Sequence, residues 1–219
     1  MFKLIKYFIV IFLMTITSSF ADLSNILKKG EVKIAVPEAF APFGSVGKTG
    51  EHEGYDVDVA KLIAKDLGVK LKIVPVVSKQ RIPFLEINKV DLVISTMGAN
   101  PKRAKSINFS SAYAPFYSGV FAPSNLKILN YDDLDGLTVG VTGGTLEDLE
   151  LTKRAPKGTK ITRFGDNAAT ISAFIAGQVD VLVTGNTVAA KMSADNPNLD
   201  IEEIYGIESL DEINKWIQN

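Results

Sequence analysis

Apolar and β-branched runs alternate with helical patterns along most of the chain. Short β-branched runs bounded by turn residues predict buried strands, and apolar residues three or four positions apart predict helices that pack by one face. In the first half, the pattern predicts strands at 32–36, 69–76 and 91–95 and helices at 56–67 and 81–88. Because the two patterns alternate, we expect βαβ units and a mainly parallel sheet.

The first long helix has clear boundaries in the sequence. We expect Asp56 to cap its N-terminus, because an aspartate side chain can accept hydrogen bonds from the first free backbone N–H groups. Val59, Ile63 and Leu67 then share one face, and Gly68 ends the helix. This face should pack on the sheet.

A second set of βαβ units follows, with strands at 138–141, 160–164 and 179–183 and helices from about 146, at 168–176 and at 187–193. Between the two sets, the apolar run Gly119–Ala122 predicts a crossing between two lobes, 22–118 and 119–203. Two facing α/β lobes form a cleft at the carboxyl ends of their strands, where open α/β sheets bind ligands. We therefore expect the ligand at the strand-to-helix loops.

Residues 1–21 have the pattern of a signal peptide. Lys3 and Lys6 form a basic start, Tyr7–Met14 is apolar, and Ser19 and Ala21 suit positions −3 and −1 of a cleavage site. The alternative is a membrane anchor, but the apolar run is shorter than the roughly 20 residues that a spanning helix needs. We expect export and cleavage before Asp22.

Composition excludes several functions. The formal net charge is −1 with no basic run, which argues against a nucleic-acid partner. The chain has no cysteine, so disulfides and thiolate metal sites are excluded. His52 is the single histidine, and we interpret it as a loop residue, so hydrolases with a histidine base are disfavoured. We expect no cofactor and no metal site.

The loop Gly140–Thr145 joins a predicted strand to a predicted helix. Free backbone N–H groups and the helix dipole at such a junction favour an anion. Thr142 and Thr145 add hydroxyl groups, and Gly144 allows close approach to the backbone. The alternative is a tight turn in which threonine caps the helix, and the glycine spacing fits neither a P-loop nor a dinucleotide-binding loop.

Two arginines are candidates for holding a carboxylate. Arg103 follows the strand at 91–95, at the expected cleft end of the sheet, and its planar fork could donate two parallel hydrogen bonds from a cleft-exposed position. Arg81, with Ser78 before it, could do the same or simply begin an exposed helix. Phe40 could cover a ligand or pack the lobe.

Several ordered motifs resemble those of bacterial extracellular solute-binding proteins of type 3, which serve ATP-driven amino-acid importers. The resemblance covers about residues 31–204 and rests on five segments: Gly54–Ala60, Val90–Ser95, Asn100–Tyr113, Gly140–Thr145 and Gly177–Thr184. It implies a periplasmic-binding-protein-like α/β fold of type II, with two βαβ lobes joined by a hinge. It also implies a monomer in the periplasm that captures an amino acid, including an acidic one, and delivers it to an ABC transporter permease.

The same resemblance implies roles for individual residues. Arg103 would grip the α-carboxylate of the ligand, with Thr145 and neighbouring N–H groups assisting from the other lobe, and Ser78 and Arg81 would form a second pair. Thr96 stands at a strand end where the family pattern has glycine. Gly185 replaces the aspartate that normally pairs with an α-ammonium group, and Asn186 could partly substitute for it. Without that aspartate, an organic acid without an amine stays open as the ligand.

The last segment departs from the family. Residues 204–219 are short for the usual return to lobe 1, although Leu210, Ile213 and Trp216 give an apolar stripe that could dock there. Two other functions stay open. One is a cyclohexadienyl dehydratase-like enzyme with Glu147 as general acid, and the other is a binding module that signals without transport.

Overall fold

The computed structural model describes residues 23–204. The expected signal peptide at 1–21 and nearly all of the expected return segment at 204–219 lie outside the described residues. Within 23–204, no helix has the length and apolar character required to cross a bilayer.

The first lobe is built on a three-stranded parallel sheet, ordered β4-β1-β5. Its strands are β1 (Glu31–Pro37), β4 (Lys70–Val76) and β5 (Leu92–Val93), and its main helices are α2 (Tyr55–Asp66) and α3 (Arg81–Glu86). The three predicted strands and both predicted helices are thus present, although β5 is much shorter than expected.

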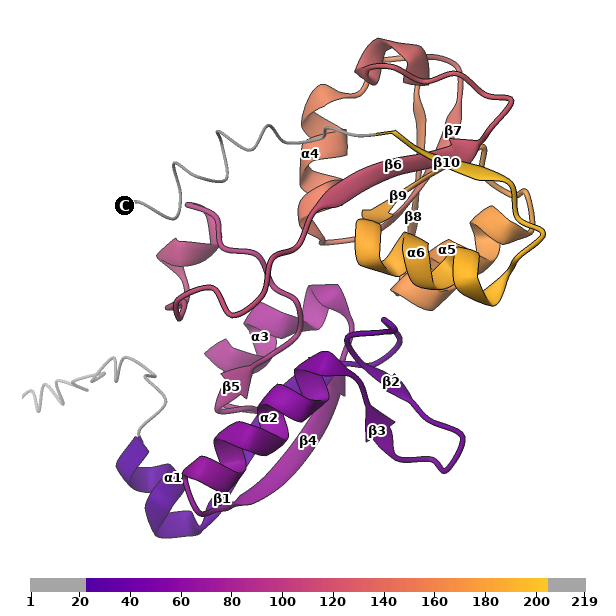
Figure 1. Cartoon of the computed structure of the whole chain (residues 1–219). Helices are drawn as coiled ribbons and strands as arrows, with labels where there is room; N and C mark the ends of the chain where they lie inside the picture. The colour runs from indigo at the N-terminus through magenta and orange to yellow at the C-terminus, as the bar shows by residue number, and fades with distance from the viewer. Residues whose placement is uncertain (1–22, 205–219) are drawn as a thin grey trace, which may run out of the picture.

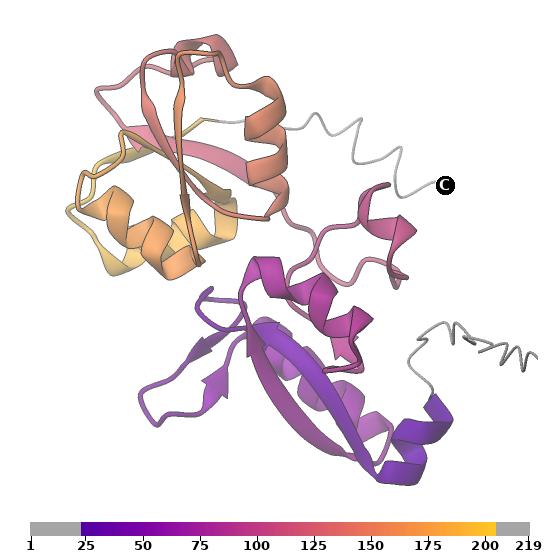
Figure 2. The same cartoon turned by 180° about the vertical axis from the view of Figure 1, so that it is seen from behind.

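Side-chain alternation along β1 gives this sheet two buried faces. Val32, Ile34 and Val36 pack on α2 through its buried face, which includes Val57, while Ala35 points to the opposite face and packs near α3. Figures 1 and 2 show α2 on one face of the sheet and α3 on the other. Burial on both faces explains why β1 is nearly continuous in apolar residues.

Several short elements of this lobe carry too little pattern to be predicted. They are α1 (Leu23–Lys29), the hairpin of β2 (Ser45–Val46) and β3 (His52–Glu53), and the 3₁₀ turns η1 (Ser78–Gln80) and η2 (Arg103–Lys105). Each is at most seven residues long, so neither helical nor strand periodicity has room to repeat.

The second lobe is built on a five-stranded mixed sheet, ordered β10-β6-β9-β7-β8. Its strands are β6 (Ser118–Pro123), β7 (Thr138–Thr142), β8 (Lys160–Phe164), β9 (Val181–Gly185) and β10 (Ile201–Ile204). Strand β7 pairs in parallel with β8 and β9, whereas β6 and β10 are antiparallel. The expectation of a mainly parallel sheet therefore holds for the first lobe, but the second is mixed.

Helices cover both faces of the second sheet. Helix α4 (Leu146–Arg154) buries Leu151 against Val139 and Val141, while α5 (Asn167–Ile175) and α6 (Asn186–Asp195) cover the face that carries Leu182. A 3₁₀ turn, η3 (Tyr131–Leu134), closes one end of this core. All three helices begin within three residues of their predicted starts.

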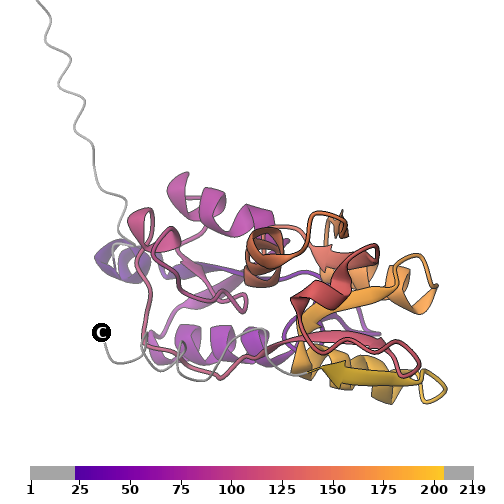
Figure 3. The same cartoon turned by 90° about the horizontal axis from the view of Figure 1, so that it is seen from above.

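The two lobes lie one above the other in Figure 1, and the chain passes between them just before β6. Seen from above, α2 and α6 lie on one side of the molecule and α3 lies on the other (Figure 3). The segment Gly119–Ala122, expected at the crossing, lies inside β6, where it pairs with β9 and β10. Hydrogen bonding on both edges makes β6 part of the second lobe.

Candidate ligand-binding cleft

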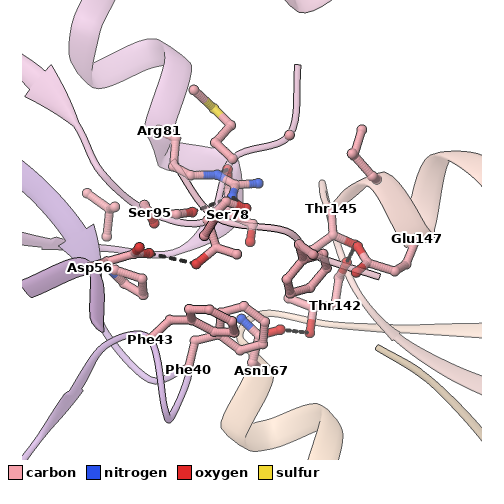
Figure 4. A pocket seen from close by; sticks show the side chains of 18 of the residues that line it. Phe40, Phe43, Asp56, Ser78, Arg81, Ser95, Thr142, Thr145, Glu147 and Asn167 are labelled. Carbon is pink, nitrogen blue, oxygen red and sulfur yellow. Dashed lines mark hydrogen bonds between the residues drawn. The ribbon is translucent and has the colours of Figure 1, made fainter. Parts of the chain in front are cut away.

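A cavity of about 240 Å³ lies between the lobes and is lined by residues of both. Figure 4 shows Asp56 and Arg81 of the first lobe on one side and Thr142, Thr145 and Glu147 of the second lobe on the other. Among the predicted site residues, those that line the cavity are Phe40, Ser78, Arg81, Thr96, Arg103, Thr142 and Thr145. Gly144 and Asn186 are not among the lining residues, although the Gly144 carbonyl contacts both arginines.

Arg81 is buried where η1 passes into α3, with 5% of its surface exposed. Its Nε donates to the Ser78 carbonyl at 3.1 Å and its Nη1 to the Ser95 carbonyl at 2.9 Å. Its Nη2 reaches the Gly144 carbonyl of the other lobe at 3.4 Å. Burial, followed by repulsion from Arg103, lowers the pKa of Arg81 to about 10. Arg81 therefore begins a helix but is not on the surface.

Arg103 was expected to be cleft-exposed, and this expectation is wrong, because only 8% of its surface is accessible. Its Nη1 donates to the Gly98 carbonyl at 2.7 Å and its Nη2 to the Gly144 carbonyl at 3.0 Å. Burial lowers the pKa of Arg103, and attraction to Glu147 partly opposes this effect. The hydrogen bonds fix the fork across the boundary between the lobes.

Within residues 23–204, neither arginine lies within salt-bridge distance of a carboxylate. Buried charges are normally paired, because removal from water costs several kcal/mol per ion. Carbonyl groups satisfy part of each guanidinium, yet the two hydrogen bonds of Arg103 leave some of its N–H donors unused. The first-lobe wall thus has two buried positive charges and free donors, which suit an anionic group.

In the loop Gly143–Thr145, the two glycines use their backbone N–H groups internally. The Gly143 N–H donates to the Phe164 carbonyl at 3.0 Å, and the Gly144 N–H donates to Asp148 Oδ2 at 2.9 Å. Thr145 is the N-cap of α4 and accepts from the Asp148 N–H at 3.2 Å. The expectation of free N–H groups at the two glycines is therefore wrong, and the threonine-capped turn is confirmed.

Gly144 has a positive φ of 84°, which glycine adopts without strain. In this conformation its carbonyl group accepts hydrogen bonds from both arginines of the first lobe. Nearby, Thr142 Oγ1 donates to Asn167 Oδ1 at 2.9 Å and lies 2.7 Å from Thr170 Oγ1. The loop therefore presents a carbonyl oxygen to the arginines, while its threonines support the second-lobe wall.

Asp56 was expected to cap α2, but it lies in the first turn, is fully buried and faces the cavity. Gly54 occupies the N-cap position, and no side chain caps the helix. Asp56 Oδ2 accepts from the Thr96 hydroxyl at 2.6 Å and Oδ1 from the Tyr113 hydroxyl at 2.9 Å. Burial raises the pKa of Asp56, and the two hydroxyl groups oppose this effect.

Sequence reasoning missed Asp56 and Tyr113 as parts of the site. A signal for Asp56 was present, because Asp56, Val57, Ala60 and Ala64 lie on the buried side of α2. A carboxylate on a buried helix face needs a local function or partner. No comparable pattern surrounds Tyr113, which lies in an irregular segment.

Aromatic rings form a further wall of the cavity. Phe40 and Phe43 lie with ring centroids 5.5 Å apart, and Phe116 packs 5.7 Å from Phe43. The same cluster includes Val188 of the second lobe, so Phe40 both lines the cavity and packs the core. A Cβ atom added to Gly185 would overlap the Phe116 ring, so the end of β9 has no room for a side chain there.

Glu147 stands in the first turn of α4, with 6% of its surface exposed, and lines the cavity. Its Oε1 accepts from the Ser118 hydroxyl at 3.1 Å, at the start of β6. Where the chain is described, no three or more histidine, aspartate or glutamate side chains are grouped to hold a metal ion. In this cavity, Asp56 and Glu147 accept hydrogen bonds from hydroxyl groups, while Arg81 and Arg103 have no carboxylate at salt-bridge distance among residues 23–204.

The family model of bacterial extracellular solute-binding proteins, family 3, matches residues 32–160. The chain belongs to this family. It is 31% identical over 208 residues to a glutamine-binding protein of Geobacillus stearothermophilus, an alignment that covers 90% of this chain and 79% of that protein. The family assignment from the sequence motifs is thus confirmed.

Two solved structures show the same architecture. The holo form of ArgBP from T. maritima superposes with a TM-score of 0.78 at 31% identity and covers 89% of each chain. An ancestral arginine-binding protein bound to arginine gives a TM-score of 0.76 at 32% identity and covers 80% of this chain and 78% of that one. This family member therefore has the two-lobed α/β fold of type II. All three relatives are binding proteins, so they do not support the dehydratase alternative.

Proposed function

We propose that this family member captures an amino acid in the cavity between its lobes and presents it to an ABC-type importer. The observation that carries this proposal is the pair of buried guanidinium groups, Arg81 and Arg103, without a carboxylate partner among residues 23–204. An α-carboxylate bound there would pair directly with the guanidinium groups and use the free N–H donors.

The remaining lining groups suit the rest of such a ligand. Phe40 and Phe43 offer an apolar surface, and hydroxyl residues of both lobes line the rest of the cavity: Ser78, Thr96, Thr142 and Thr145. A cavity of about 240 Å³ suits a single small molecule rather than a peptide. The relatives named above bind glutamine or arginine, which fits this size class.

Ligand-driven closure follows from the division of these groups between the lobes. The expected lobes are 22–118 and 119–203. We move Ser118 to the second lobe and place a hinge just before it, because β6 pairs with β9 from Ser118 onward and with β10 on its other edge. A ligand that contacts Arg103 of the first lobe and the second-lobe residues of the cavity at the same time stabilises only the closed arrangement. A permease in the inner membrane would then bind the closed surface.

The signal-peptide pattern of residues 1–21 supports export to the periplasm, where this family acts outside the cytoplasm. We expect the mature chain to be a monomer that needs no cofactor. Mass determination of the exported protein tests cleavage before Asp22, and gel filtration tests the oligomeric state.

A thermal-melt screen of the mature protein tests the proposal. The panel contains the common L-amino acids, L-cystine, succinate, glutarate and prephenate. A bound amino acid at a hundredfold excess over its Kd should add about 2.7 kcal/mol to the free energy of unfolding. The proposal would be contradicted if none of the amino acids raised the melting temperature, or if the protein converted prephenate to a product.

A further inference from the structure

We propose that Glu147 binds the cationic nitrogen of a zwitterionic ligand whose carboxylate occupies the Arg81–Arg103 pair. This inference rests on the proposed function and narrows it, because it selects ligands with an α-amine over organic acids without one. Three properties of the cavity support it: its charge balance, the state of its carboxylates and the arrangement of Glu147 relative to the arginines.

The charged side chains that line the cavity are Arg81, Arg103, Glu38, Asp56, Glu147 and Asp166. Two are positive and four are negative, so the wall carries a formal net charge of −2. A dicarboxylate would add two more negative charges to a partly desolvated space, whereas a zwitterion adds none. Like charges interact strongly in such surroundings, so the wall disfavours diacids.

Glu147 differs from the other three carboxylates because it is buried and one of its carboxylate oxygens accepts no hydrogen bond from the described chain. Both carboxylate oxygens of Asp56 already accept hydroxyl hydrogen bonds, Asp166 Oδ1 caps α5 through the Ala169 N–H, and Glu38 is exposed. Glu147 is buried, and the Ser118 hydroxyl bonds only its Oε1. Within the described chain, its Oε2 has no hydrogen-bond donor and no cation at salt-bridge distance.

Glu147 is also placed to act together with the arginines. Its charge raises the pKa of both Arg81 and Arg103, although it lies beyond salt-bridge distance from either. A small zwitterion between them would bring its carboxylate to the first-lobe arginines and its ammonium to second-lobe Glu147. Each lobe would then hold one end of the same ligand, which couples recognition of the amine to closure.

The end of β9 cannot supply this charge. Gly185 lies against the Phe116 ring, so an acidic side chain at this position would require the aromatic cluster to rearrange. Asn186, the next residue, does not line the cavity, and its side-chain oxygen accepts from its neighbour Thr187. The first turn of α4 therefore provides the buried acidic group on this side of the cavity.

Isothermal titration with pairs of compounds that differ only in the α-amine tests the inference. L-glutamine is compared with glutaramate, and L-arginine with 5-guanidinopentanoate. The wild-type protein should bind the amino acid of a pair at least about 30-fold more tightly, because an unpaired buried charge costs about 2 kcal/mol or more. Glu147→Gln, which keeps an oxygen for Ser118, should lose about 30-fold in affinity for the amino acid and little for its partner.

Two further variants complete the design. Glu150→Gln makes the same charge change on the same helix outside the cavity lining, and it should match the wild type. Glu147→Asp keeps the charge on a shorter side chain and should keep part of the preference for the amine. Ligand-free melts of each variant show that it is folded.

The possible results separate this inference from the function on which it rests. Equal affinity of the wild type for both members of a pair, or unchanged amino-acid binding by Glu147→Gln, would overturn the role of Glu147. Amino-acid capture itself would survive either result. A wild-type protein that binds none of the amino acids or organic acids would overturn both.

Discussion

The Thr96 hydroxyl donates to Asp56 Oδ2 at 2.6 Å while the Thr96 backbone has a positive φ of 44°. A β-branched residue in the left-handed region is strained by about 1–2 kcal/mol, so the surrounding structure must hold it there. The hydrogen bond to a fully buried carboxylate provides part of that restraint. Thr96 is therefore a cavity-lining residue whose strained backbone is held in part by its hydrogen bond to Asp56.

A comparison of two substitutions at this position isolates the strain. Thr96→Ala and Thr96→Gly both remove the hydroxyl from Asp56, but only glycine relaxes the backbone. We expect the free energy of unfolding of Thr96→Gly to exceed that of Thr96→Ala by about 1 kcal/mol, so the glycine variant should unfold at a higher urea concentration. Thr96→Ser keeps the hydrogen bond and serves as the control. Equal stability of the alanine and glycine variants would contradict the assigned strain.

The buried carboxyl of Asp56 should make stability depend on pH. Because burial raises its pKa above the ordinary value of 3.8, the folded state keeps a proton that the unfolded state loses as the pH rises. The contribution of Asp56 to stability is therefore greatest below pH 3.8 and falls until the pH passes its folded-state pKa.

Asp56→Asn removes this titration and provides the measurement. We expect the free energy of unfolding of the wild type, minus that of Asp56→Asn, to decrease as the pH rises from about 3.8 through the folded-state pKa and then to stay constant. Urea melts of both proteins from acidic to neutral pH test this. A difference that increases with pH over the same interval would show the opposite pKa shift.

The strands and long helices were predictable because each repeats its pattern several times. Strand β1 is apolar on both faces, and α2 places Val57, Ala60 and Ala64 on one side. The antiparallel edge of the second sheet was not predictable, because Ile201–Ile204 carries only two apolar residues. Pairing of such a short strand depends on the exposed edge of β6, which lies about 80 residues earlier in the chain.

The cavity-lining residues were partly predictable and their contacts were not. Position after a strand placed Arg103 and Thr145 at the correct end of the sheets, because that rule follows from topology. Which groups the side chains contact depends on the other lobe. The carbonyl of Gly144 accepts from both arginines only because the two lobes approach each other there.

The contact between Phe116 and Gly185 should resist a larger side chain. Gly185→Ala places a methyl group into the Phe116 ring, and overpacking of this kind costs about 1–3 kcal/mol. Phe116→Ala removes the ring and costs stability through lost packing with Phe40 and Phe43.

The double variant tests whether the two residues are coupled. With the ring absent, the added methyl group has room, so the double variant should lose less stability than the sum of the single losses, by about 1 kcal/mol or more. Urea melts of the four proteins give this coupling energy. Strictly additive losses of stability would show that the Phe116 ring does not restrict the space for a side chain at position 185.

Substitutions of Arg103 test whether its guanidinium group holds the ligand carboxylate. Arg103→Lys keeps a positive charge but loses the planar fork that bonds Gly98 and Gly144, so it separates charge from geometry. We expect the lysine variant to bind the amino acid found in the melt screen about 10- to 100-fold more weakly, and Arg103→Ala to show no ligand-induced shift.

Without ligand, Arg103→Ala should lose about 1–3 kcal/mol, because the Gly98 carbonyl loses its Arg103 donor and the Gly144 carbonyl keeps only the longer bond from Arg81. Arg154→Lys, on the far end of α4, is the matched control, since Arg154 lies over the Tyr131 ring and not at the cavity. Titration calorimetry and melts measure both quantities, and wild-type affinity in Arg103→Lys would show that the fork does not hold the carboxylate.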